Sequence, residues 1–241
     1  MPMHRARRIA SVAVTAALAV AGLSACRSAP DVAAYVGQAR ITEQRVTDVF
    51  EGARANQVAA TPGQPPVTAI SRQDVVDTMV GLDVMRELAR QRKVSPTAID
   101  PSRVAQSLGV KAQAEYVALF TEYRGLLNAL SAGVQPAQPT QADLRDVYDR
   151  LTKGGANPDG TSFAQFSSGL AEQDQQTLAQ NIGLRNKLEP EIGKLDTKVN
   201  PRYRSPELPL VSTQTSDGKV LPLIVLRLAP STSESPVLDL S

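Results

Sequence analysis

The chain has 241 residues, of which 26 are basic and 24 are acidic, and its formal net charge is +2. It contains one cysteine, one histidine and no tryptophan. The near balance of charge excludes the strongly basic face of a nucleic-acid-binding domain, so we expect no nucleic-acid partner. The length and a hydrophobic content of 42% suit one globular domain with an appendage.

The chain begins with the pattern of an export signal. Arg5, Arg7 and Arg8 form a positively charged start, and residues 11–23 are apolar or small throughout. A basic region followed by an apolar region of this length is typical of a secretory signal peptide. The apolar stretch is too short to cross a bilayer as a permanent helix. We therefore predict that residues 1–25 are a signal peptide.

The predicted signal ends at the only cysteine. Leu23, Ser24 and Ala25 precede Cys26, and this sequence resembles the lipobox of bacterial lipoproteins. The resemblance implies that the Cys26 thiol receives a diacylglyceryl group and that the chain is cut before it. The fatty acyl chains would then anchor the protein on the extracytoplasmic face of the bacterial cell membrane, with residues 26–30 as a short tether. The alternative, cleavage by the ordinary signal peptidase after Ala25, would leave an exposed thiol in an oxidising compartment.

Removal of the signal changes the chemistry that is left. Three basic residues and no acid precede Cys26, so 23 basic and 24 acidic residues remain, a net charge of −1. The only histidine, His4, also lies in the signal, and acylation of Cys26 leaves no free thiol. Ser-His-Asp and Cys-His catalysis and His/Cys zinc sites are thereby excluded. We predict no catalytic residue, no cofactor, no metal and no enzyme activity, although a two-carboxylate glycosidase stays formally possible.

The first predicted elements are two short strands and a helix. Residues 32–36 alternate as a half-buried strand does, and Gly37 can form a tight turn into a returning strand. Thr42 is suited to cap a helix because its hydroxyl can accept a hydrogen bond from the first turn. In that helix, residues 46, 49, 50 and 53 are apolar and share one face.

The middle of the chain is predicted to be helical. After a Pro- and Gly-rich loop at 56–70, Ser71 caps a helix that ends near Lys93, and a short helix follows at 100–108. The clearest apolar stripe then consists of Tyr116, Leu119, Phe120, Tyr123, Leu127 and Leu130.

Two further helices are predicted before the sequence changes character. Thr140 caps the first of them, and a long helical stretch runs from Thr161 to Leu188. The Gln-rich part of this stretch, residues 172–180, is expected to face solvent.

The last part of the chain is predicted to form strands. Residues 207–213 and 219–228 are apolar and β-rich, and Asp217-Gly218 between them favours a hairpin turn. Pro222 is expected at an edge or a bulge because it cannot donate to a ladder. We expect strand 219–228 to pair with strand 32–36. The predicted fold is therefore mainly α, one domain over residues 31–228 closed by a small antiparallel sheet, with a disordered tail at 229–241.

Several segments resemble extracytoplasmic foldases of the SurA and PrsA type, which are related to the trigger-factor chaperone domain. These segments are VAAYVGQARITEQRV (32–46), MVGLDVMRELARQRKVSP (79–96), PTQADLRDVYDRL (139–151) and VNPRYR (199–204). The last of them resembles, more specifically, an NPRYG element found late in actinobacterial lipoproteins with this domain, and Arg204 stands where that element has glycine. The resemblance implies a SurA-like helical N-terminal chaperone domain.

The resemblance also defines what is missing. Such foldases insert a parvulin prolyl-isomerase module whose site uses a pair of histidines, and residues 152–198 are too short and too Gln-rich to form it. The implied function is chaperone-like binding of unfolded, secreted or envelope polypeptides, without ATP or catalysis. The alternative is a structural or adaptor lipoprotein that holds one specific partner in an envelope complex.

The sequence does not single out the client-binding residues. The stripe of Tyr116, Phe120, Tyr123 and Leu127 could line a client groove, but a helix must bury such a face somewhere, so we expect core. Phe163 and Phe166 are better candidates for an exposed apolar contact. Tyr203 is expected to be a packed turn residue. Arg202 and Arg204 are expected to be solvated or paired, with contact to a phosphate or lipid headgroup as the alternative.

Overall fold

The computed structural model describes residues 31–58, 69–157, 160–215 and 220–229. All of them belong to one compact unit, Asp31–Ser241. Cys26, the tether at 26–30 and residues 230–241 of the predicted tail lie outside the described residues.

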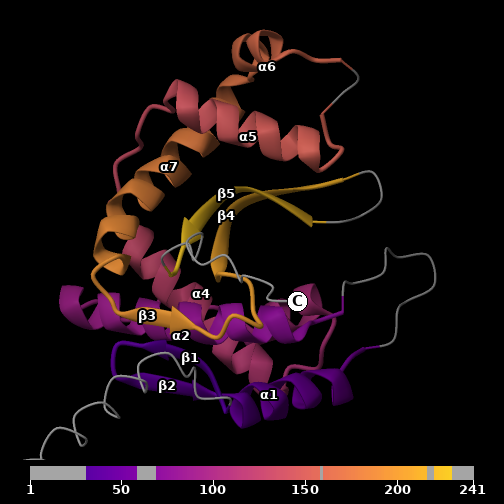
Figure 1. The fold of residues 1–241 in the computed structure, drawn as a ribbon, viewed down its shortest axis with the longest axis vertical. Coiled ribbons are helices and arrows are strands. Elements are labelled where there is room, and N and C mark those ends of the chain that lie inside the picture. The colour runs from indigo at the N-terminus through magenta and orange to yellow at the C-terminus, as the bar shows by residue number, and fades with distance from the viewer. Residues whose placement is uncertain (1–30, 59–68, 158–159, 216–219, 230–241) are drawn as a thin grey trace, which may run out of the picture. The chain divides into compact units, whose positions relative to one another are not determined.

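The described part is mainly α, as predicted (Figure 1). Its helices are α1 (Glu43–Ala55), α2 (Arg72–Arg92), α3 (Pro101–Leu108), α4 (Glu115–Ser131), α5 (Gln141–Lys153), α6 (Phe163–Gly169) and α7 (Glu172–Ile192). Its strands are β1 (Val32–Val36), β2 (Ala39–Thr42), β3 (Thr197–Val199), β4 (Glu207–Gln214) and β5 (Val220–Arg227).

The predicted helix starts are confirmed by their capping bonds. The Thr42 hydroxyl accepts a hydrogen bond from the Arg45 backbone N–H at 3.1 Å. Ser71 and Thr140 each form a capping box with the acid three residues later, which satisfies two of the free N–H groups at a helix start. At the other end of α2, Lys93 has a left-handed backbone with φ 55°, and this reversal ends the helix.

The prediction that strand 32–36 pairs with strand 219–228 is wrong. β1 is the central strand of an antiparallel sheet of order β2-β1-β3, so its partner from the C-terminal part of the chain is the three-residue strand β3. β5 instead pairs with β4 in a separate hairpin. The β4–β5 hairpin closes only a short loop, and both edges of β1 are already occupied by β2 and β3, so β5 has no free edge of β1 to pair with.

The hairpin itself is confirmed, including the place of its proline. β4 and β5 pair from Glu207 opposite Arg227 to Gln214 opposite Val220. The register shifts beside Pro222, which lies opposite Ser212, so the missing N–H falls at an irregularity of the ladder. The turn at Asp217 lies outside the described residues.

The hairpin separates two apolar cores. Leu208, Leu226 and Leu228 pack into the main core with β1, α1, α2 and α4. Ile224, together with half-buried neighbours in both strands, packs against α5 and α7 in a second core. In Figure 1 the hairpin accordingly lies between the α2–α4 layer and the α5–α7 layer. A smaller cluster lies under α3.

The prediction of one helix from Thr161 to Leu188 is wrong. The chain forms α6, leaves the helical conformation at Leu170 (φ −62°, ψ 123°) and starts α7 at Glu172. Gly169 is a poor helix former, and the extended Leu170 is drawn into the second core. The Gln-rich residues 172–180 are exposed as predicted, apart from the buried Leu178 and Ala179.

A glycine allows a loop to lie directly on α7. A Cβ at Gly183 would be 2.3 Å from the Gln135 carbonyl oxygen, closer than real contacts allow. Beside it, the Ala137 backbone N–H donates to the Ala179 carbonyl at 2.9 Å. The loop that joins α4 to α5 is thus fixed to the middle of α7.

Gly183→Ala should therefore destabilise the protein by about 1–3 kcal/mol, since its methyl group meets backbone that cannot rotate away. Gly52→Ala is the matched control, because a Cβ at Gly52 in α1 meets nothing within 4 Å. That control should stabilise the protein by about 0.5–1 kcal/mol through helix propensity. Urea unfolding followed by circular dichroism measures both changes, and equal effects of the two substitutions would contradict the close approach at α7.

Candidate functional site

The apolar stripe on α4 is core. Tyr116, Tyr123 and Leu127 are buried, and Phe120 is half-buried between the two tyrosines, with ring centroids 6.1 and 5.9 Å away. The Tyr116 hydroxyl lies 3.0 Å from the Thr78 hydroxyl of α2. Over Tyr116, Phe120 and Tyr123 this face is filled by the protein's own side chains and is not an open groove for a client, whereas Leu127 also borders a surface depression described below.

Phe163 and Phe166 are half-buried in the structure. Both rings pack on Tyr148 of α5, each with its centroid 5.7 Å from the tyrosine ring. The Arg145 guanidinium lies over the Phe163 ring, 3.6 Å from its centroid. A cation over an aromatic face is attractive, so one face of the Phe163 ring is already covered by Arg145.

The 199–204 segment is a clamp that fastens β3 to the start of the domain. The buried Asn200 amide donates to the Val32 carbonyl at 3.0 Å, and the Asn200 backbone N–H donates to the Ala33 carbonyl at 2.8 Å. The Tyr203 hydroxyl donates to Glu43 Oε2 at 2.7 Å, and burial together with this carboxylate raises the pKa of Tyr203 to about 12. Tyr203 is thus the packed residue that the sequence predicted.

The two arginines of this clamp are held in different ways, Arg202 through its side chain and the exposed Arg204 through its backbone. Arg202 forms an ion pair with Glu43 at 3.4 Å. The backbone of Arg204 is held by Gln73, whose Oε1 accepts from the N–H at 3.0 Å and whose Nε2 donates to the carbonyl at 3.3 Å. Among the described residues other than glycine, Lys93 alone has a positive φ, so Arg204 occupies a backbone conformation that needs no glycine.

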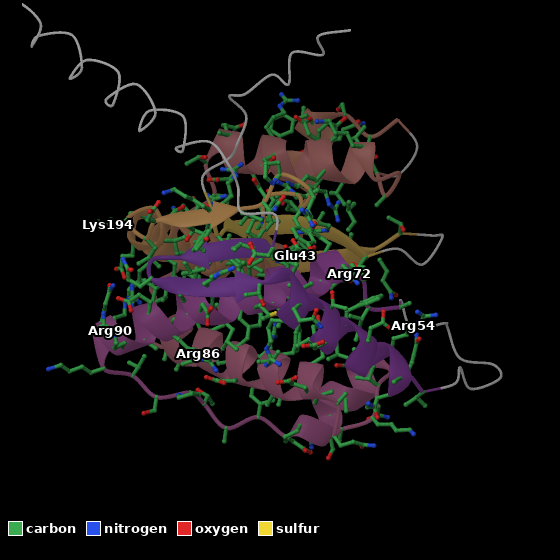
Figure 2. All side chains as sticks on the ribbon, turned by 60° about the horizontal axis from the view of Figure 1, so that its bottom comes forward. Glu43, Arg54, Arg72, Arg86, Arg90 and Lys194 are labelled. Carbon is green, nitrogen blue, oxygen red and sulfur yellow. The ribbon has the colours of Figure 1, made fainter. Side chains whose placement is uncertain are left out.

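Two of the depressions on the surface of the described part bear on a binding function. The larger, about 530 Å³, lies between the β1–β2 turn, α2 and residues 194–196. Its lining carries three cations and three acids, and Figure 2 shows Arg86, Arg90 and Lys194 along this side of the molecule. Arg86 is held by Glu122 with two bonds of 2.7 Å, and Arg90 by Glu87. The charges of this depression compensate one another, so it offers little attraction to a ligand of either sign.

The smaller depression is the better candidate site. It has a volume of about 280 Å³ and is lined by residues of α4, α7 and β4, and we call it the α4–α7–β4 crevice. Apolar side chains of α4, α7, β4 and the loop after α4 form its floor: Leu127, Val134, Leu184, Pro209 and Leu210. Its polar residues are Arg124, Asn128, Ser131, Gln180 and Asn181.

The rim of the crevice consists mainly of carboxamides. Asn128 and Gln180 are exposed, and their side chains form no hydrogen bond with any other described residue. Asn181 donates to the Thr177 carbonyl at 2.8 Å, which leaves its oxygen available as an acceptor. A carboxamide offers both donors and an acceptor, as a peptide bond does, so this rim can hydrogen-bond a polypeptide backbone.

The crevice borders the less covered strand of the hairpin. In the described part of the chain no third strand pairs with β4, and only Leu208 of its eight residues is buried. β5, by contrast, has three buried residues in succession. An unpaired strand edge can accept an extended segment as an additional strand.

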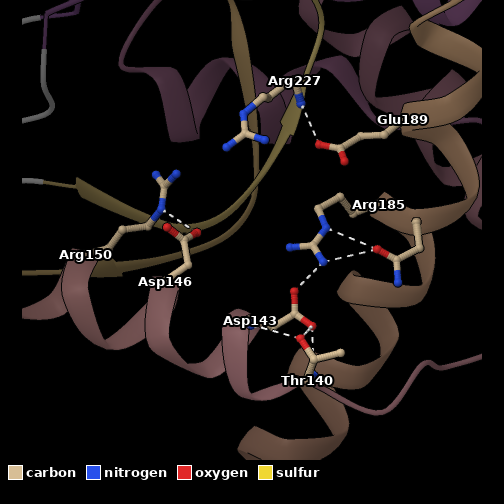
Figure 3. Close-up of polar contacts among 8 residues, drawn as sticks. Thr140, Asp143, Asp146, Arg150, Arg185, Glu189 and Arg227 are labelled. Carbon is tan, nitrogen blue, oxygen red and sulfur yellow. Dashed lines mark hydrogen bonds and ion pairs between the residues drawn. The ribbon is translucent and has the colours of Figure 1, made fainter. Parts of the chain in front are cut away.

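Polar contacts hold α7 in place along the crevice (Figure 3). Arg185 donates to Asp143 at 2.5 Å, and both side chains are largely buried. Burial alone would raise the pKa of Asp143, but hydrogen bonds from Thr140 and Arg185 outweigh it and lower that pKa. The acid of the α5 capping box therefore also joins α5 to α7.

No single stretch of sequence predicted this crevice. Its residues come from α4, the following loop, α7 and β4; the sequence predicted Leu127 in a core stripe, Gln180 on a solvent-facing stretch and Leu210 in a strand, and gave no sign that they meet. The feature that brings α4 and α7 together is the close approach of the 134–137 loop to Gly183, and the sequence carries no motif for this contact.

The described part of the chain brings together no group of three or more His, Cys, Asp or Glu side chains that could bind a metal ion. It also has no helix that is long and apolar enough to cross a membrane. Cys26, the predicted lipid-attachment residue, lies outside the described residues, so its role stays a prediction.

No family model matches the chain, and no curated protein or solved structure is significantly similar to it. These comparisons therefore do not test the resemblance to SurA and PrsA type foldases, which stays a prediction.

One carboxyl near the clamp has a strongly altered pKa. Burial raises the pKa of Asp77 to about 7, with contributions from Asp74 and Glu207, while the Gln73 hydrogen bond and Arg204 act in the opposite direction. The proton is thus held more tightly in the folded state than in the unfolded chain, where a pKa of about 4 is expected. Stability from this group is complete below pH 4 and is lost as the pH rises to about 7.

Asp77→Asn replaces the carboxyl with an amide that cannot ionise. The variant should therefore be more stable than the native protein between pH 5 and 8, where the native Asp77 loses its proton. We expect a gain of about 1–2 kcal/mol, reduced from the full effect because the carboxyl is partly solvated. Asp48→Asn is the control, since Gln44 donates to exposed Asp48 at 2.7 Å in the same i, i+4 arrangement as Gln73 and Asp77. Urea unfolding at several pH values measures the difference; an equal pH dependence for both variants would refute the burial of Asp77.

Proposed function

We propose that this chain is a bacterial lipoprotein, anchored through Cys26 on the extracytoplasmic face of the cell membrane, that binds secreted or envelope polypeptides without catalysis. The leader and the residues before Cys26 support the anchor. The observation that carries the binding function is the α4–α7–β4 crevice, with its apolar floor, carboxamide rim and neighbouring open strand.

In this proposal a client segment lies extended along the crevice. Its backbone bonds with the rim amides and the edge of β4, and its apolar side chains cover Leu127, Leu184 and Leu210. Each square ångström of apolar surface removed from water contributes about 25 cal/mol. A crevice of about 280 Å³ covers only a short piece of chain, so binding is weak and readily reversed, as transient protection of a client requires.

The tether would keep this crevice close to the site of export. Four residues separate Cys26 from Asp31, the first described residue. Five steps of 3.8 Å between Cα atoms reach at most about 19 Å. The folded domain would therefore meet polypeptides soon after they leave the membrane.

The second candidate, an adaptor that holds one specific partner, is favoured by a different observation. The apolar stripe of α4 is buried, and the large apolar side chains more than a third exposed among the described residues are Tyr35, Val58 and Val220. Such a surface offers little area for many unrelated clients. One short segment of a single partner would suffice to fill the crevice.

The anchor is tested first by Cys26→Ala. The native protein should appear in the membrane fraction with a mass that includes acyl chains on the residue at position 26. The variant should lack these chains and leave the membrane fraction. Cell fractionation and mass spectrometry measure both results, and an unacylated native protein free in the medium would reject the anchor.

The crevice is tested by Gln180→Trp, which places a large ring into it from an exposed rim position. Native protein should suppress aggregation of an unfolded secreted client at modest molar excess, and the variant should lose most of this effect. Gln173→Trp is the matched control, because Gln173 is exposed on α7 two turns earlier and does not line the crevice. Light scattering measures aggregation, and no suppression with several clients would reject the chaperone function.

Pull-down from detergent-solubilised membranes separates the two candidates. A chaperone should recover many clients in substoichiometric amounts, whereas an adaptor should recover one partner at a fixed ratio. In either case Gln180→Trp should lose the bound polypeptides and Gln173→Trp should retain them.

A further inference from the structure

The crevice carries a single charge. Arg124 is the one charged side chain among the ten residues that line it, and it is exposed on α4. Within the described ranges, Arg124 forms no ion pair and no hydrogen bond through its guanidinium. Arg86, Arg92 and Arg185, by contrast, each have a carboxylate partner within 2.7 Å. The crevice thus presents a positive charge without a compensating acid.

This charge lies beside the apolar floor. Arg124 and Leu127 are three residues apart on α4, so their Cβ atoms are about 5–6 Å from each other. In an extended segment, residues i and i+2 point to the same side and are about 6.5–7 Å apart. An acidic side chain and an apolar side chain separated by one residue would therefore reach Arg124 and Leu127 together.

The exposure of the floor limits which apolar residues fit. Leu127 and Leu184 are 6% and 7% exposed, so each presents only a small area of apolar surface. Leu210 of β4 contacts both the main core and the second core and is half-buried. Branched aliphatic side chains of moderate size suit such a floor, because they cover it without entering the core.

We propose that the α4–α7–β4 crevice selects extended segments of a partner polypeptide in which an acidic residue and an aliphatic residue are separated by one position. The carboxylate pairs with Arg124, the aliphatic side chain lies on Leu127 and Leu184, and the backbone bonds with the amide rim. This inference rests on the proposed function and adds the chemical class of the bound segment.

Short fluorescent peptides test the selection. Three peptides share alternating Leu and Ser residues. They differ at one Leu position, which is replaced by Asp, Asn or Lys, so that one Ser separates this residue from the next Leu. With full-length protein in mild detergent at low salt, fluorescence anisotropy should show the Asp peptide binding about threefold to tenfold more tightly than the Asn peptide. The Lys peptide should bind most weakly, and added salt should reduce the differences.

Substitutions at Arg124 assign this preference to the crevice. Arg124→Gln should bind the Asp and Asn peptides equally, and Arg124→Glu should favour the Lys peptide. Arg54→Gln is the control, because Arg54 is exposed on α1, outside the crevice, and its loss should leave the preference unchanged. Circular dichroism checks that the variants are folded.

The outcomes separate this inference from the proposed function. Equal binding of all three peptides by the native protein would overturn charge selection and leave polypeptide binding intact. No binding of any peptide, together with no suppression of aggregation, would reject both. Tighter binding after removal of residues 230–241, which include Glu234 and Asp239, would make these residues the occupant and overturn a partner polypeptide. Self-association that rises with protein concentration and that Gln180→Trp blocks would make a second copy of the chain the occupant, and would likewise overturn a partner polypeptide.

Discussion

The arrangement of the domain depends on a hairpin that packs into two apolar cores. Leu226 and Leu228 lie in the main core, and Ile224 lies in the second core. An isolated pair of strands is at best marginally stable in water, so β4 and β5 persist because both cores cover them. This constraint explains why α5 and α7 form a layer of their own.

The crevice follows from the same constraint. The two helical layers cover β5 well but leave β4 less covered, so a space remains where α4 of one layer and α7 of the other approach its edge. The contacts at Gly183 and between Arg185 and Asp143 fix α7 at this position. A binding surface built in this way is bounded by rigid elements, which reduces the entropy lost when a segment binds.

Local features could be predicted from the sequence, because short-range chemistry determines them. The caps at Thr42, Ser71 and Thr140 depend on residues three positions apart, and the hairpin depends on two adjacent strands. The fold class and the buried stripe of α4 followed from periodicity alone. These features need no knowledge of distant contacts.

The features that were missed depend on distant contacts. β3 has three residues and becomes a strand only because Ala34 and its neighbours lie beside it. The break at Leu170 depends on a second core that forms around the hairpin. The crevice joins parts of three helical and strand segments, none of which carries a local motif for binding. Tertiary packing decides each of these cases.

The place of β1 has a mechanical consequence. It follows the predicted tether directly, and it is the central strand of its sheet, bonded to β2 on one side and to β3 on the other. A force exerted through a lipid anchor would enter the domain at Asp31 and pull along this strand. Two ladders would then have to shear at the same time, and Asn200 would oppose the slip through its bonds to Val32 and Ala33. The domain would therefore bear load at the end where the predicted anchor would attach it.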